Sequence, residues 1–566
     1  MNDLEIGDRV VLPQWLSFSQ ACLLREHAVF PSRRESNVRW EPVSKDLHEG
    51  IRKFREAPQP FVASELMGLA VVMGEKELAA ELAGFVVTKP IVGAVALSHA
   101  NQILRPQGPD RIENRTHVGI LKDQLRNNPH DAIAWIERAR CYVVEGQTNK
   151  AKRAVLTALH LAPGNRHIVR AAIRYFVHTD DWDTSLRIAQ RAYAINPDPL
   201  IFGPLLSIAT HVDKMPKRIK PQVEDAMRSE DRLLNSEILG AAGALELIHG
   251  ADQKSRKLFK GAWADPTRPV IGHSQWVLRE RLTGLASEQG LDFKQSNQAM
   301  GWLRQVFLDF RGSLAACTEW SLEEPYSREA YILGSSSACL SGDFLSAENL
   351  AKTGLNMNPK DRVLINNLGF AQLHNGRITA AEETLKPLER QLGDETQVAP
   401  CATFGLLRMA QKRPEEGEKL YVQAIERAMK AKNRPLATQA LLNYLYSTLT
   451  ILKSLDVQLL SGATKILKNS SNVCCIGVAD AIARKIQRSD LQGNDEASAA
   501  AKEFVQSVKS TKDAYIHNVR ARFQSVDLQS MDLDNDLTSG WMSGQSSDQG
   551  ALKLNLNTPS KVPNIE

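Results

Sequence analysis

The chain has 566 residues, of which 43% are hydrophobic and 24% charged, with a formal net charge of +5. This length accommodates several domains, and the composition is typical of a soluble globular protein and favours nothing more specific. The N-terminus lacks the apolar stretch of a secretory signal, and the longest apolar runs are too short to span a bilayer. Seven scattered cysteines predict reduced thiols, so we expect a cytoplasmic protein with no membrane contact.

The N-terminal region, residues 1–110, does not follow the periodicity of the rest of the chain. The apolar residues 10–12 are compatible with a strand, and residues 61–73 and 75–87 have the pattern of a helical hairpin that turns at Gly74. A polar stretch rich in proline and glycine, residues 105–110, then breaks the pattern. We expect a mostly helical cap or small domain up to residue 110.

A regular spacing follows, since Pro129, Pro163 and Pro197 lie 34 residues apart. Each interval has the pattern of two helices joined by a turn, with small residues where the helices must approach closely and large ones where they must fill space. A period of this size is typical of stacked helical repeats. The first unit carries its signature residues at Trp135, Ala139, Tyr142, Gly146, Ala151, Val155, Ala158, Leu161 and Pro163.

This pattern resembles that of the tetratricopeptide repeat (TPR) family. Two later units carry its features at Leu368-Gly369 and Phe404-Gly405, whereas the first unit has Arg138-Ala139 at the usual Leu-Gly position. The resemblance implies an all-α, right-handed solenoid in two blocks, with non-repeat helical regions at both ends. The predicted bounds are a first block at 111–266, a degenerate helical connector at 267–325, a second block at 326–430, C-terminal helices at 431–524 and a disordered acidic tail at 525–566.

Motifs of catalysis and cofactor binding are not found in the sequence. It contains no GxxxxGK[ST], GxGxxG, HExxH, CxxC or GxSxG motif, and its 13 histidines do not pair at ligand spacing. We therefore expect no enzyme activity, no cofactor and no metal.

The resemblance implies that the first helix of each repeat lines a concave groove. This places Arg140, Arg170 and Arg174 on one wall of the first block, where guanidinium groups can clamp a carboxylate or phosphate. Solvated arginines or intramolecular salt bridges are the alternative. In the second block the groove residues Asn366 and Phe370 predict a less charged site that contacts the main chain of a peptide. We expect that replacing the three arginines with Glu weakens partner binding and leaves the fold intact.

Basic residues also cluster between the two blocks, and the clusters include Lys214, Lys217, Arg218 and Lys257. With Trp263 nearby to stack on a base, they are compatible with nucleic-acid contact or with an ordinary solvated face. The function predicted first is a non-catalytic scaffold or adaptor that binds a protein or peptide partner, which can be acidic, in a repeat groove. The alternatives are a nucleic-acid-associated protein and a non-catalytic subunit of an enzyme complex. In a variant of the first hypothesis, the acidic tail occupies the groove.

Overall fold

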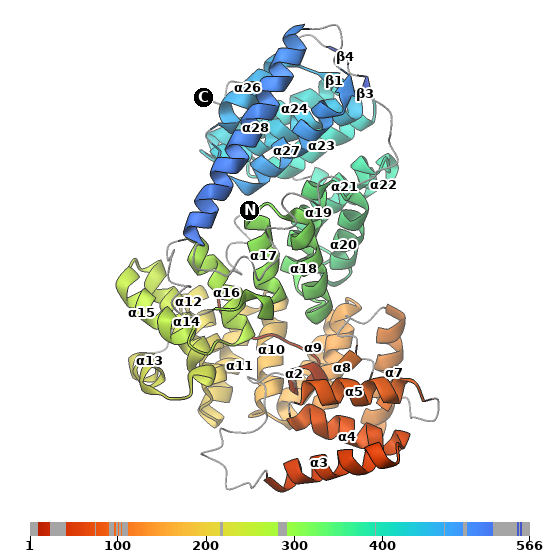
Figure 1. Ribbon diagram of the computed structural model, residues 1–566, viewed down its shortest axis with the longest axis vertical. Helices are drawn as coiled ribbons and strands as arrows, with labels where there is room; N and C mark the ends of the chain where they lie inside the picture. The colour runs from red at the N-terminus through yellow and green to blue at the C-terminus, as the bar shows by residue number, and fades with distance from the viewer. Residues whose placement is uncertain are drawn as a thin grey trace. The chain divides into compact units, whose positions relative to one another are not determined.

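The computed structural model describes residues 10–22, 41–73, 75–89, 96–97, 100, 103–104, 111–215, 219–280, 291–390, 392–468, 470–490, 495–523, 552–553 and 555–556. Within these residues the chain is almost entirely helical (Figure 1). It divides into two compact units. The first unit is Met1–Ala299 with Glu319–Ser327, and the second is Met300–Thr318 with Arg328–Glu566. The predicted bounds of the connector and of the two blocks stay predictions.

The helices of the first unit follow one another in chain order. They are α2 (Phe18–Cys22), α3 (Glu41–Glu56), α4 (Pro60–Met73), α5 (Lys76–Val87), α7 (Arg111–Asn127), α8 (Ala132–Val144), α9 (Thr148–Leu161), α10 (Arg166–His178), α11 (Trp182–Ile195), α12 (Pro199–His211), α13 (Ile219–Arg228), α14 (Arg232–Ile248), α15 (Asp252–Ala262), α16 (Arg268–Glu280) and the short η3 (Phe293–Gln295). The next two, α17 (Asn297–Val306) and α18 (Phe310–Glu323), contribute residues to both units.

The second unit is also helical and, within its described residues, contains four very short strands. Its elements are α19 (Arg328–Ser341), α20 (Phe344–Met357), α21 (Arg362–His374), α22 (Ile378–Glu389), α23 (Val398–Ala410), α24 (Pro414–Lys430), α25 (Arg434–Ser447), η4 (Thr448–Leu452), β1 (Ser454–Leu455), α26 (Val457–Leu467), α27 (Val473–Gln487), β2 (Ser489–Asp490), α28 (Asp495–Arg522), β3 (Leu552–Lys553) and β4 (Asn555–Leu556).

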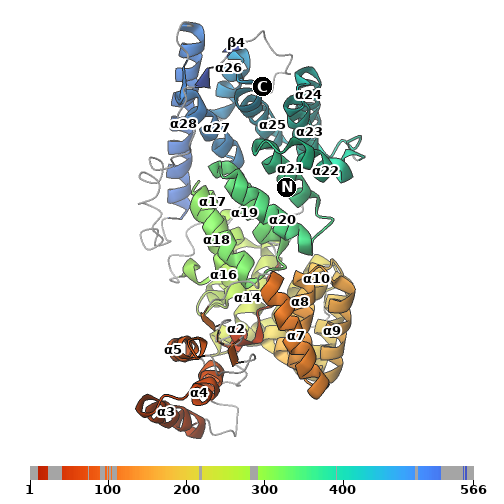
Figure 2. The same ribbon diagram turned by 90° about the vertical axis from the view of Figure 1, so that its right-hand side faces the viewer.

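Consecutive helices pack as antiparallel hairpins, and each hairpin stacks on the next. The pairs α8 with α9, α10 with α11 and α14 with α15 build the first unit, and α19 with α20, α21 with α22 and α23 with α24 build the second. Figure 2 shows α7, α8, α9 and α10 as one stack. This arrangement confirms the prediction of an all-α solenoid of TPR-like helical hairpins.

Each hairpin turn contains a residue in the left-handed conformation. Gly146 has a φ of 70° and Asp180, 34 residues later, a φ of 60°. After Gly146 the chain closes on the first helix, since Gln147 N donates to Tyr142 O at 2.8 Å. Helix starts repeat as well, because Asp131 and Asn165 each accept a hydrogen bond from a backbone amide in the first turn. The 34-residue period of the sequence is therefore the spacing between equivalent turn residues and equivalent helix-capping residues.

Small residues occupy the positions where two helices of a hairpin cross. A Cβ on Gly369 would lie 2.6 Å from the Leu385 side chain, and one on Gly405 would lie 2.8 Å from Tyr421. Any larger residue at either position would push the helices apart. The two glycines of the Leu-Gly and Phe-Gly pairs are thus required by the close approach of the helices.

The N-terminal region contains the expected helical hairpin, which α4 and α5 form together with α3 around a core of their own. The strand expected at residues 10–12 is not formed. Residues 11–17 form neither helix nor strand, and the amides of Val11 and Trp15 donate to side chains.

The tail contributes two short strands. β4 pairs in parallel with β1, and β3 pairs in parallel with β2. Four residues of the stretch expected to be disordered are therefore paired with the helical body of the second unit. The other tail residues, 525–551, 554 and 557–566, lie outside the described residues.

Candidate functional site: the inner face of the first block

A stretch of the chain that ends at the first residue of α2, residues 10–18, covers the first helices of the repeats in the first unit. Three of its backbone amides donate to side chains distant in the sequence: Val11 N to Ser207 Oγ at 3.2 Å, Trp15 N to the Tyr326 hydroxyl at 2.8 Å, and Phe18 N to Glu137 Oε1 at 3.0 Å. We call residues 10–18 the N-terminal segment. The surface of α8, α10, α12 and α14 that it covers is the inner face.

Trp15 is the largest anchor of the N-terminal segment. Its side chain is fully buried, and its ring packs edge-on against Tyr175 and at 5.4 Å from Tyr326. Val11 is also fully buried and faces Gly240, where a Cβ would meet its methyl group at 3.5 Å. A Val and a Trp four positions apart in extended chain are separated by roughly 13 Å. The inner face thus holds an extended chain at two apolar points and bonds its main chain near each of them.

The three predicted groove arginines lie under this segment and are buried. Both Nη atoms of Arg170 donate to the carboxylate of Glu237 at 2.8 Å, and neither side chain is exposed. Arg174 stacks over the Tyr326 ring at 5.1 Å and faces Glu324. Arg140 donates to the backbone oxygen of Glu323 at 3.3 Å. These contacts correspond to the intramolecular alternative of the sequence analysis.

Burial controls the titration of the polar groups on the inner face. It raises the pKa of Glu137 to about 7, partly opposed by the nearby Arg140 and by the amide of Phe18. Burial also lowers the pKa of His167 to about 4, and the charges of Arg170 and Arg140 lower it further. His167 is therefore neutral at pH 7, and its ring packs edge-on against Phe18. Glu137 and His167 thus both contact Phe18 of the N-terminal segment.

The second block places Asn366 and Phe370 on one face of α21. Both are half-buried, and the Asn366 Oδ1 atom has no hydrogen-bond partner within the described residues. The ring of Phe370 contacts His374 at 4.6 Å. The adjacent Asn367 bonds the Ser335 hydroxyl at 3.0 Å. The role of Asn366 and Phe370 in binding a partner stays a prediction.

Helix α27 packs against first helices of this block. It contacts α19 and α25, and a Cβ on Gly477 would lie 2.7 Å from the Phe310 ring. Ile476 and Val478 belong to the same core as Leu340 and Leu373. Helix α27 is therefore part of the core of the second block, as Trp15 of the N-terminal segment is part of the core of the first block.

The predicted nucleic-acid contacts are separated from their aromatic partner. Lys257 is exposed, and Lys214 forms an ion pair with Asp183 at 2.6 Å. Lys217 and Arg218 lie outside the described residues. Trp263 is 1% exposed and packs against Phe259. The expectation that Trp263 stacks on a base is wrong, because its ring is part of the core.

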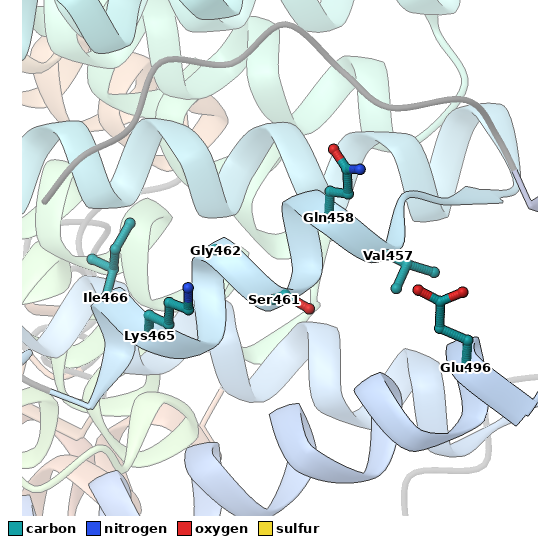
Figure 3. Close-up of a pocket in the computed structure, with 7 residues that line it drawn as sticks. All are labelled: Val457, Gln458, Ser461, Gly462, Lys465, Ile466 and Glu496. Atoms are coloured by element: carbon teal, nitrogen blue, oxygen red, sulfur yellow. The ribbon is translucent and has the colours of Figure 1, made fainter.

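A pocket of about 300 Å³ lies between α26 and the start of α28 (Figure 3). Lys465 and Glu496 stand at its two ends, and both side chains are exposed. It lacks the convergent buried polar groups of a small-molecule site. In the described ranges no three His, Cys, Asp or Glu residues gather as metal ligands. Nor does any described helix combine the length and apolar character needed to cross a bilayer.

No family model and no curated protein match the sequence. Among solved structures, the APC/C hetero-tetramer Cut9-Hcn1 is similar at 12% identity with a TM-score of 0.28, covering 86% of this chain and 98% of that chain. A monomeric mutant of IFIT1 with Gppp-AAAA is similar at 11% identity with a TM-score of 0.26, covering 72% and 99%. At these values the likeness adds nothing to what the helices themselves show.

Sequence reasoning missed the residues that matter most on the inner face: Trp15, Ser207, Glu237 and Tyr326. Trp15 lies in a stretch without helical periodicity, and its partner Tyr326 is 311 residues away. Glu237 is 67 residues from Arg170. One signal was present in the sequence, since a tryptophan in a short apolar stretch ahead of a repeat array is a candidate anchor.

Proposed function

We propose that the protein is a non-catalytic scaffold that binds a partner through an extended peptide segment on the inner face of the first block. The observation that carries this proposal is the N-terminal segment itself. Side chains of the helical stack receive its amides from Val11, Trp15 and Phe18, which is recognition of extended main chain. An extended ligand needs such bonds at intervals and apolar pockets for a few side chains.

The contacts favour an apolar partner segment over an acidic one. The buried arginines are neutralised by Glu237 and Glu324 or bonded to main chain, and the N-terminal segment contains no ionisable side chain. A charged partner group would have to enter this buried surface without a free counter-charge, which costs free energy. We therefore revise the expected partner to an extended, apolar peptide.

Gly240 offers a direct test, because it faces the place of Val11. Replacing Gly240 with Leu would fill that place while keeping a residue that favours the helix. The matched control is Gly119→Leu on α7, where a Cβ meets nothing within 4 Å. Tagged full-length chains are purified from the native host with nuclease treatment, and the bound proteins are identified. A stoichiometric protein should be lost from Gly240→Leu and kept by Gly119→Leu, and equal retention by both would contradict the proposal.

A nucleic-acid function is the second candidate, favoured by the exposed Lys257 on α15. In that case nucleic acid, and no stoichiometric protein, copurifies with the chain. The affinity of the chain for nucleic acid then falls steeply as the salt concentration rises and also falls in Lys257→Glu. Gly240→Leu does not change this affinity.

A further inference from the structure

The N-terminal segment is held on the inner face without the usual ties of secondary structure. Among the described residues, no backbone-to-backbone hydrogen bond involves residues 10–16. The segment depends on the hydrogen bonds to Ser207, Tyr326 and Glu137 and on its buried side chains. Its attachment is therefore that of a bound peptide and not that of a strand in a sheet.

The N-terminal segment also buries polar atoms that lack hydrogen-bond partners. The indole Nε1 of Trp15 and the Oε1 of Gln14 are buried, and neither has a hydrogen-bond partner in the part of the chain that the structure describes. A buried donor or acceptor without a partner weakens the association that buries it. A ligand with an aromatic side chain that has no N–H avoids one of these two defects.

From these observations we propose that residues 10–18 are a built-in competitor for the inner face. Its true ligand is an extended peptide in another protein, with an aliphatic residue four positions before an aromatic one. This inference rests on the proposed function, since it names the partner's chemistry and the regulation of the same site. The occupied state keeps the apolar face covered until such a peptide replaces the segment. Apparent affinity is then reduced by the fraction of molecules in which the segment is seated.

The test uses a fluorescent peptide of residues 8–20 as the probe and the full-length chain as the receptor. Trp15→Ala in the chain removes the anchor of the competitor and leaves the probe unchanged. We expect the probe to bind this variant at least about tenfold more tightly than it binds the wild type. Trp182→Ala is the matched control, because Trp182 stacks on His211 outside the inner face, and this change should not alter probe binding. Adding Gly240→Leu to Trp15→Ala should abolish binding and thereby locate the probe on the inner face.

The peptide itself tests the ligand chemistry. A probe with Trp15→Phe should bind at least as tightly as the native probe, and one with Trp15→Ala should not bind. A Phe probe that binds about tenfold more weakly would overturn the role assigned to the unpaired indole.

Two outcomes separate this inference from the proposed function. Equal probe affinity for wild type and Trp15→Ala would contradict the proposal that residues 10–18 compete for the inner face. The inner face would still be a peptide-binding site. Absence of probe binding to both chains, each folded by its melting transition, would overturn both proposals. If Trp15→Ala does not fold, Phe18→Ala takes its place, because Phe18 is half-buried and its loss removes the contact with His167. A smaller gain in affinity, about threefold, is then expected, and no gain would overturn the competitor.

Discussion

The Arg170 guanidinium and the Glu237 carboxylate form a fully buried, bidentate pair under the inner face. Removing one partner leaves an uncompensated buried charge. We therefore expect Arg170→Ala to lower the free energy of unfolding by roughly 3–5 kcal/mol. Urea denaturation of the full-length chain measures this, and Arg187→Ala, at an exposed position, should change it by less than about 0.5 kcal/mol. Equal effects of the two changes would contradict the pairing.

The double replacement Arg170→Met with Glu237→Leu should recover most of that loss, because it removes both charges and keeps the volume filled. By the same reasoning, the expectation that Glu at all three arginine positions leaves the fold intact is reversed. A Glu at position 170 would face the Glu237 carboxylate in a fully buried site.

His374 in the second unit predicts a dependence of stability on pH. Its ring stacks on Phe344 at 4.4 Å, and burial lowers its pKa to about 3, helped by the charge of Lys485. The unfolded chain, with the ordinary value of 6.5, takes up the proton first as pH falls. The contribution of the neutral His374 ring to the free energy of unfolding is thus fully present above pH 6.5. It is lost as the pH falls towards 3.

From pH 6.5 to about pH 5 this group should lower the free energy of unfolding by roughly 1.5 kcal/mol. Urea denaturation of wild type and His374→Phe at both pH values isolates this contribution, because the difference between the two chains changes only with the titration. An unchanged difference between the two pH values would contradict a neutral, buried His374.

The hairpin turns show what a single element requires. Gly376, between α21 and α22, and Lys412, between α23 and α24, occupy the same left-handed position with φ of 74° and 64°. In both turns the following amide bonds the carbonyl five residues earlier. Lys412→Gly should therefore raise the free energy of unfolding by up to about 1 kcal/mol, and Gly376→Ala should lower it by roughly 1 kcal/mol. Thermal unfolding of the two variants checks this, and a change of the same sign in both would refute the turn argument.

The hairpins were predictable because their determinants are local. Turn residues such as Gly146 and caps such as Asp131 recur with the period of the repeat, and each acts within a few residues of its own position. The occupant of the inner face was not predictable in this way. An extended segment has no period of its own, and Trp15 is placed by Tyr175 and Tyr326, which are distant in the sequence.

The whole molecule consists of two helical-repeat units, and in each unit a different segment of the chain packs against the first helices of the repeats. In the second unit, α27 packs against them as part of a continuous core. In the first unit, the N-terminal segment packs against them through hydrogen bonds to side chains, most of its residues are buried, and Trp15 belongs to the core of the first block. The role of the three arginines in binding a partner stays a prediction. Intramolecular salt bridges were the alternative for these arginines, but the sequence could not identify Glu237 and Glu324 as the partners of Arg170 and Arg174, because the pairs form only in the folded chain.

Hydrogen–deuterium exchange of residues 10–18 in the full-length chain tests the central claim most directly. The account predicts slow exchange of the Val11, Trp15 and Phe18 amides in the wild type, because each is hydrogen-bonded to the helical stack. In Gly240→Leu these amides should exchange fast, while the amides of α8 and α10 remain protected. Exchange of the wild-type segment as fast as that of the free peptide would contradict the account, because the inner face would then be uncovered.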